Sequence, residues 1–186
     1  LLEPSLAPDI VASITKASAS FATVKHIKIS DTLELNNLVG VFNAIRAYEA
    51  WQCHGQWLES TNPKMATAIK ERFLNCKDAT EEEATKAGIE RKKLRQKLGA
   101  LLADDTALCF PTTIDLPPLK LASAEALQQN RTANMSLCAM ASLSGFPQIS
   151  IPISLSNRKP IVKTGLSLLA NYEMDLAIIN AAAAFE

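Results

Sequence analysis

Histidine is scarce in this sequence, and its cysteines are widely scattered. The 186 residues include 2 histidines and 4 cysteines. His26 and His54 do not form an H-E-x-x-H motif, and no two cysteines form a C-x-x-C pair. Because metal sites usually combine such ligands at short, regular spacings, we predict no metal site and no cofactor. We interpret the cysteines as buried, reduced thiols.

Net charge is also lacking. The 19 lysines and arginines are balanced by 19 aspartates and glutamates. A chain without a strong positive field has no general attraction for nucleic acid or for an anionic membrane. No apolar run approaches the roughly 20 residues that span a bilayer, and the first residues lack the pattern of a secretion signal. We therefore predict no nucleic-acid partner, no membrane partner and a cytoplasmic location.

The residues that are present suit a globular protein with a substantial core. Hydrophobic residues make up 48% of the chain and charged residues 20%. Apolar residues recur at helical spacing and predict helices at residues 9–22, 36–57, 64–76, 124–143 and 173–184. Short apolar runs predict strands at residues 24–29, 107–110, 148–153 and 161–169.

A run of charged residues begins after Thr80. Glu81, Glu82 and Glu83 come first, and basic residues concentrate toward Lys97. A threonine cap, an acidic first turn and later basic residues predict a helix whose charges favour its dipole. Because acids are interleaved and aromatics are missing, we interpret the run as a solvated helix face and not as a nucleic-acid site.

The expected strands are apolar on both faces. That pattern is typical of a central sheet covered by helices, and it disfavours a half-exposed antiparallel sheet. Helices also precede and follow the strands along the chain, which indicates the α/β class. We therefore predict an α/β fold with α/β/α layers around a mixed central sheet.

The order of several motifs points to a known family. An apolar run ends in Pro111-Thr112-Thr113, and a later helix leads through Gly145-Phe146-Pro147 into another apolar run that contains Pro152. Upstream, residues 42–58 read FNAIRAYEAWQCHGQWL, with a Tyr-Glu pair before a His-x-x-Trp. These landmarks resemble the C-terminal portion of the amidase signature family. The nearest resemblance is to the plant-type branch that includes indole-acetamide hydrolases.

The resemblance implies hydrolysis of a carboxamide to a carboxylate and ammonia. It implies a serine nucleophile, a second serine that relays the proton, a lysine base and a glycine-rich loop that holds the oxyanion. The six glycines of this chain are never adjacent, and no Ser-Ser pair occurs. We therefore assign no catalytic residue within this chain. The chain alone is predicted to be inactive.

The resemblance also implies an organisation and a set of partners. Residues 1–186 would form the C-terminal part of a single amidase domain, whose N-terminal part carries the nucleophile loop. One partner would be a small-molecule amide. The other would be the N-terminal half of the domain or a complementary chain, and a homodimer is a further possibility. Thr112, Thr113 and Phe146 are the candidates for lining the acyl pocket. The alternative interpretation is that both threonines cap a strand end and Phe146 belongs to the core.

Other interpretations of the same residues stay open. A non-catalytic, amidase-like interaction module would keep its core after losing its chemistry. A separately expressed subunit would pair with a chain that supplies the catalytic residues. A penicillin-recognising serine enzyme, built from residues 13–16, 60–62 and 163–165, is disfavoured because Ser13 falls inside an amphipathic helix.

Overall fold

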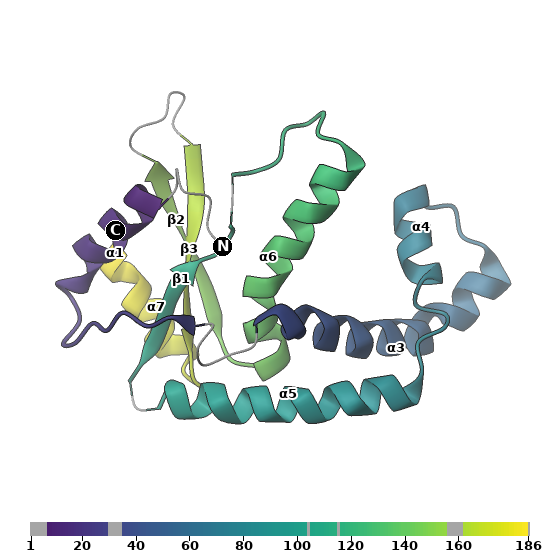
Figure 1. Ribbon diagram of the computed structural model, residues 1–186, viewed down its shortest axis with the longest axis horizontal. Coiled ribbons are helices and arrows are strands. Elements are labelled where there is room, and N and C mark those ends of the chain that lie inside the picture. Colours follow the sequence, from purple (N-terminus) through teal and green to yellow (C-terminus); the bar gives the residue numbers. More distant parts are fainter. Residues whose placement is uncertain (1–6, 30–34, 104, 115, 156–161, 186) are drawn as a thin grey trace.

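The structure, a computed structural model, describes residues 7–29, 35–103, 105–114, 116–155 and 162–185 (Figure 1). In chain order the elements are α1 (Ala7–Ser18), α3 (Leu35–Thr61), α4 (Thr67–Leu74), α5 (Glu81–Leu101), β1 (Ala107–Pro111), α6 (Ala124–Ser144), β2 (Gln148–Leu155), β3 (Val162–Ala170), α7 (Asp175–Ala182) and the short 3₁₀ helix η1 (Ala183–Phe185). Most elements expected from periodicity are found within a few residues of these bounds.

The sheet lies between two layers of helices. Its strand order is β1-β3-β2, and both pairs are antiparallel. Ala107 of β1 and Gln148 of β2 lie opposite Ala170 and Leu169 of β3. In Figure 1, α1 and α7 lie on one side of the sheet, and α3, α5 and α6 lie on the other. The predicted α/β class is confirmed.

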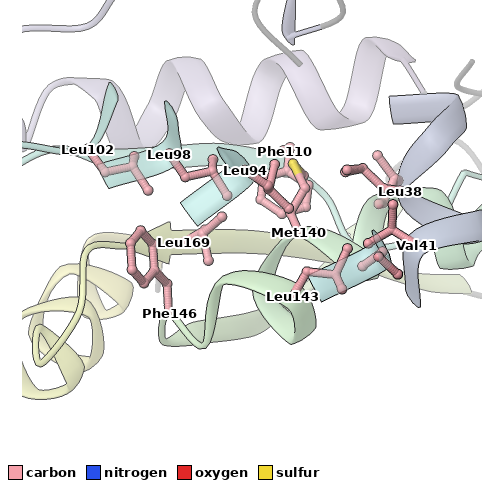
Figure 2. Packing of buried hydrophobic residues seen from close by; sticks show 13 residues of the cluster. Leu38, Val41, Leu94, Leu98, Leu102, Phe110, Met140, Leu143, Phe146 and Leu169 are labelled. Carbon is pink, nitrogen blue, oxygen red and sulfur yellow. The ribbon is translucent and has the colours of Figure 1, made fainter. Parts of the chain in front are cut away.

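The larger core lies between the sheet and helices α3, α5 and α6 (Figure 2). Leu94 and Leu98 of α5 and Leu102, which directly follows the helix, stand one turn apart and form a continuous buried stripe. They pack in one cluster with Met140 of α6 and Leu169 of β3. Full burial of a leucine side chain stabilises a fold by about 1.5–3 kcal/mol. This stripe therefore holds α5 along the base of the molecule.

A second apolar layer covers the opposite face of the sheet. Ile10 of α1 packs with Leu155 of β2 and Leu166 of β3. Ile178 of α7 packs with Leu168 of β3. Side chains on a strand alternate between faces, so Leu168 and Leu169 serve the two different cores.

The strand predicted at residues 24–29 is wrong. Residues 23–28 have no regular structure, and Val24 and Ile27 are 44% and 48% exposed. Alternation of apolar and polar side chains indicates a strand-like surface, but a strand also needs a neighbour for its backbone hydrogen bonds. In the described ranges the sheet consists of β1, β2 and β3.

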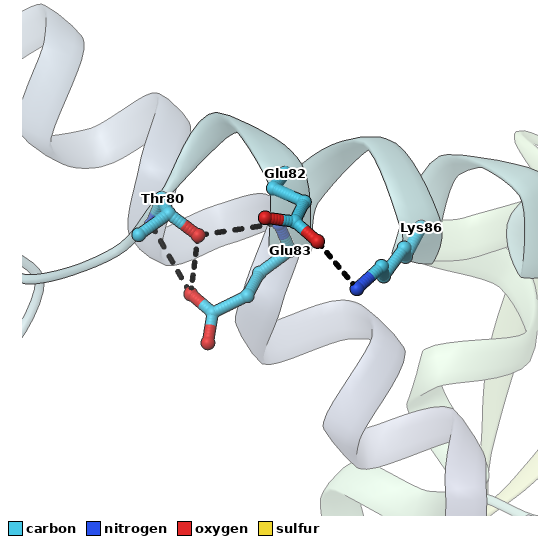
Figure 3. Close-up of polar contacts among 4 residues, drawn as sticks. All are labelled: Thr80, Glu82, Glu83 and Lys86. Carbon is cyan, nitrogen blue, oxygen red and sulfur yellow. Dashed lines mark hydrogen bonds and ion pairs between the residues drawn. The ribbon is translucent and has the colours of Figure 1, made fainter.

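Helix α5 begins with a reciprocal cap (Figure 3). The Glu83 N–H donates to Thr80 Oγ1 at 3.2 Å, and the Thr80 N–H and hydroxyl donate to the Glu83 carboxylate at 3.1 and 2.9 Å. These hydrogen bonds lower the pKa of Glu83, first through the Thr80 backbone and then through its hydroxyl. Glu82 and Lys86 form an exposed ion pair one turn on. The capping prediction is confirmed.

None of the described helices is both long and apolar enough to cross a lipid bilayer.

Replacing Thr80 with alanine should lower the free energy of unfolding by about 1 kcal/mol, because the Glu83 N–H loses its acceptor and the Glu83 carboxylate loses the Thr80 hydroxyl. Thr85→Ala is the matched control, since Thr85 is exposed inside α5 and alanine is the better helix former. Urea unfolding followed by circular dichroism would measure both. The deficit should shrink as the pH falls from the ordinary glutamate pKa of 4.5 through the lower pKa of Glu83 in the folded chain, because protonation removes the charge that accepts the cap hydrogen bonds. Equal losses in the two variants would contradict the cap.

Candidate functional site

Hydroxyl groups associated with all three strands meet on one face of the sheet. Thr112 directly follows β1, Ser150 belongs to β2 and Ser167 belongs to β3. Thr112 Oγ1 lies 2.9 Å from Ser150 Oγ and 2.7 Å from Ser167 Oγ. The side-chain amide of Gln148 donates to Ser167 Oγ at 2.8 Å. We call Thr112, Gln148, Ser150 and Ser167 the hydroxyl cluster.

The cluster forms because Gly165 has no side chain. The Thr112 N–H donates to the Gly165 carbonyl at 2.8 Å, which extends the β1–β3 pairing by one residue. A Cβ atom on Gly165 would lie 2.6 Å from Thr112 Oγ1 and 2.8 Å from Ser150 Oγ. Side chains do not approach this closely, so any larger residue would push the two hydroxyls away from their present positions.

Burial sets the direction of the hydrogen bonds in the cluster. Ser167 is fully buried, and Ser150 is exposed. Each hydroxyl has one hydrogen to donate. If Ser167 donates to Thr112 and Thr112 donates to Ser150, both inner hydroxyl hydrogens are used. The reverse order leaves the buried Ser167 hydrogen without an acceptor among the described residues, at a cost of about 1–3 kcal/mol. The Ser150 hydroxyl is therefore left to donate outward, polarised by the bonds behind it.

The two faces of β2 differ in polarity. Its isoleucines and Leu155 pack against α1 and α7, whereas Ser150, Pro152 and Ser154 alternate with them and are exposed. The prediction that every strand is apolar on both faces is therefore wrong for β2. Ser150 was not predicted as a site residue because β2 was expected to be apolar on both faces. The non-aliphatic residue at every second position of β2 was the signal that could have identified it.

Helix α6 holds the loop that follows Thr112. The Asn134 side chain accepts the Ile114 N–H at 2.9 Å and donates to Asn130 at 3.0 Å. The Cys138 thiol lies 3.8 Å from the Thr112 carbonyl. Thr112 is thus fixed on one side by the backbone of β3 and on the other by α6.

The other two predicted pocket residues lie elsewhere. The Thr113 hydroxyl lies 3.3 Å from that of Thr164, and Thr164 alternates with Gly165 and so lies on the opposite face of the sheet. Phe146 is 6% exposed and belongs to the larger core, where Arg95 lies 5.8 Å from its ring. The structure therefore brings neither residue into the hydroxyl cluster.

The cysteines near the sheet are poor nucleophiles. Burial raises the pKa of Cys109 to about 11 and also raises that of Cys138. Both thiols therefore stay protonated at neutral pH, and the thiolate is the reactive form. Within the described ranges no three His, Cys, Asp or Glu side chains gather in an arrangement suited to a metal ion.

Comparison with characterised proteins gives several relatives. The chain is 28% identical to Amidase 1 of Arabidopsis thaliana over 175 residues, which cover 88% of this chain and 40% of the relative. It is 31% identical over 144 residues to Outer envelope protein 64, chloroplastic, of the same plant, covering 76% of this chain and 24% of the relative. A relative in Pisum sativum, Translocon at the outer membrane of chloroplasts 64, is 24% identical over 173 residues, which cover 92% of this chain and 28% of the relative. No protein-family model matches.

Solved structures match almost the whole fold. A bacterial aryl acylamidase of the amidase signature enzymes superposes with a TM-score of 0.73 over 100% of this chain and 40% of its own, at 15% identity. The chain thus has the fold of the C-terminal portion of an amidase signature enzyme. A Kluyveromyces lactis allophanate hydrolase also superposes, with a TM-score of 0.75 and 21% identity, over 95% of this chain and 29% of its own. The chain spans two fifths or less of the length of the three named sequence relatives.

These relatives contradict the predicted cytoplasmic location. The names of Outer envelope protein 64 and of the Pisum sativum translocon place those two relatives at the outer membrane of an organelle. The prediction rested on balanced charge and on the lack of a long apolar run. Neither property distinguishes a cytosolic protein from one associated with an organelle surface.

Replacing Gly165 with alanine should lower the free energy of unfolding by about 1–3 kcal/mol, because the new methyl group overlaps the hydroxyls of Thr112 and Ser150. Gly88→Ala is the matched control, since nothing lies within 4 Å of a Cβ at that helical position. Alanine there should stabilise α5 by about 0.5–1 kcal/mol. Chemical denaturation would measure both, and a neutral Gly165→Ala would contradict the packing described.

Thiol accessibility provides a second check. Cys53 is exposed and Cys109 is partly buried. Iodoacetamide at pH 8 should modify Cys53 well before Cys109, because the raised pKa of Cys109 leaves little thiolate below pH 11. Peptide mass spectrometry after timed quenching would follow each site, with a urea-unfolded sample as the control in which the two rates converge. Equal rates in the folded chain would contradict the burial of Cys109.

Proposed function

We propose that residues 1–186 form the C-terminal part of a single amidase domain that hydrolyses a carboxamide to a carboxylate and ammonia. The hydroxyl cluster carries this proposal, because it places a polarised donor on the exposed face of β2. The nucleophile and the base would come from a portion of the fold outside this chain, which has no Ser-Ser pair and no adjacent glycines. Amidase 1 supports the proposed reaction.

The chemistry of the cluster suits a neutral, polar acyl group. Its side chains offer hydroxyls and one amide and carry no formal charge. An outward Ser150 hydroxyl can donate to an oxygen of the substrate, and Thr112 behind it fixes its orientation. Thr112 and Ser150 are therefore proposed to form one wall of the acyl pocket. The assignments of Thr113 and Phe146 to this pocket stay predictions.

The proposed partners are a small-molecule amide and the portion of the fold that carries the catalytic serines. Strands β1 and β2 are the two outer strands of the described sheet. Unpaired outer strands expose backbone groups that another strand can satisfy. A complementary portion, within the same polypeptide or in a second one, would meet this need. The homodimer remains a weaker alternative.

A non-catalytic interaction module is the second candidate. The two relatives named for chloroplast outer membranes favour it, since their names describe membrane proteins and not enzymes. A fold can keep its core while its chemistry is lost. In that case the chain would contribute to a protein contact at an organelle surface, and the hydroxyl cluster would be structural.

Steady-state ammonia release from simple carboxamides, with the chain assembled with its catalytic portion, would test the proposal. Ser150→Ala should lower kcat/KM by about fivefold to tenfold, the effect of one lost hydrogen bond to a neutral group. Ser154→Ala is the matched control, because Ser154 is exposed on the same face of β2. It should leave kcat/KM unchanged.

Three outcomes would contradict parts of this proposal. Equal activity of Ser150→Ala and the unmodified protein would remove Ser150 from the pocket. No ammonia from any carboxamide, in an assembly whose serines and lysine are intact, would favour the interaction module. Ammonia release by this chain alone, purified free of longer species, would contradict the view that its catalytic residues lie elsewhere.

A further inference from the structure

A shallow cavity lies between α5 and the turn that links β3 to α7. Its volume is about 370 Å³, which is in the range of sites for small organic molecules. Two cations, two aromatic rings and two carboxamides line it: Lys92, Arg95, Gln96, Phe146, Asn171 and Tyr172. We call it the Arg95 cavity. It shares no residue with the hydroxyl cluster.

Helix α5 supplies the polar wall of the Arg95 cavity. Arg95 and Gln96 follow Lys92 by three and four positions, so the three side chains project from the same side of the helix. Leu94 and Leu98 anchor α5 in the larger core. The helix therefore holds this wall at a fixed place beside the sheet.

Two aromatic rings hold the Arg95 guanidinium. Its Cζ atom lies 5.0 Å from the ring centroid of Tyr172 and 5.8 Å from that of Phe146. Phe146 is buried, whereas Tyr172 is exposed, so Phe146 closes the inner end of the cavity and Tyr172 reaches the solvent. A guanidinium that lies over ring faces keeps the N–H groups at its edge available for hydrogen bonds.

The turn after β3 fixes Tyr172 and joins the two walls. The Asn171 side-chain oxygen accepts the Tyr172 N–H at 2.8 Å, and the Asn171 side-chain NH₂ donates to the Gly99 carbonyl of α5 at 3.5 Å. The Met174 N–H donates to the Asn171 carbonyl at 3.2 Å and closes the turn. These contacts form the cavity from the chain's own residues.

The cations of the cavity lack the acidic partner that a neighbour on α5 has. Lys93 lies 2.7 Å from Glu90. In the part of the chain that the structure describes, no ion pair or hydrogen bond joins the side chain of Lys92 or Arg95 to another residue. Glu173 is exposed in the adjacent turn and does not line the cavity. The cavity therefore combines uncompensated positive charge with an aromatic floor.

We propose that the Arg95 cavity binds a small aromatic carboxylate. The carboxylate would accept two hydrogen bonds from the planar fork of Arg95, and Lys92 would add a second positive charge. The aromatic body of the ligand would pack against Tyr172 and Phe146. The inference does not rest on the proposed amidase activity, because it uses other residues and a different face of the molecule.

Titration of this chain with naphthoate, followed by two-dimensional amide NMR, tests the proposal. The Kd should be on the order of 1 mM, as expected for a ligand of this size. The shifted amide signals should cluster at residues 92–96, 146 and 171–172. Naphthalenemethanol, which has the ring without the charge, and acetate, which has the charge without the ring, should each bind at least about tenfold more weakly.

Arg95→Gln should weaken naphthoate binding about tenfold, because one charge-assisted pair is lost. Lys97→Gln is the matched control, since Lys97 is exposed on the same helix and does not line the cavity. It should leave the Kd unchanged. Tyr172→Leu gives a second measurement that keeps every charge, and it should weaken binding about threefold to tenfold through the lost ring contact.

Four outcomes would overturn the proposal. They are the absence of cavity shifts at ten times the expected Kd, equal binding of naphthalenemethanol, equal losses in Arg95→Gln and Lys97→Gln, and unchanged binding in Tyr172→Leu. An acidic peptide that displaced naphthoate with at least about tenfold higher affinity would also overturn it, because the occupant would then be a protein segment. A failure of these tests leaves the proposed amidase activity untouched, since ammonia release does not enter any of them.

Discussion

The rest of this structure depends on the pairing of β3 with two strands that precede it. β3 hydrogen-bonds along both of its edges, to β1 on one side and β2 on the other. It also supplies buried side chains to both apolar layers, through Leu169 on one face and Leu166 and Leu168 on the other. Helices α3, α5 and α6 are anchored on one of these faces, and α1 and α7 on the other. Without β3, neither layer would have a continuous surface to pack against.

The same strand explains why hydroxyl groups converge where they do. Ser167 is buried on the face of Leu169, and the bare backbone of Gly165 leaves room beside it for Thr112 and Ser150. A polar cluster inside a sheet is stable only when its inner groups are all bonded. That condition leaves one unused donor at Ser150, on the exposed side. The polarity of this face of β2 is therefore a consequence of how the central strand is built.

Local features of the fold could be predicted from sequence, and long-range ones could not. The cap at Thr80 involves residues three positions apart, and Gly145 ends α6 with a φ of 70°, a conformation that glycine adopts readily. Thr112 and Ser167 are 55 positions apart, so only the sheet register brings them together. The strand prediction at Val24 was wrong for a related reason, because alternation of apolar and polar residues along the sequence does not show whether a neighbouring strand is available for pairing.

The central position of β3 also affects the order in which the chain can fold. Both neighbours of β3 leave the ribosome before β3 does, so β1 and β2 emerge with their inner edges unpaired. Helices can form early because their hydrogen bonds are local, whereas pairing across dozens of residues must first overcome the entropy of closing a long loop. Until β3 is synthesised, β1 and β2 lack the strand that lies between them in the folded sheet. Such intermediates aggregate readily, and we expect this segment of the polypeptide to be a preferred client of chaperones during synthesis.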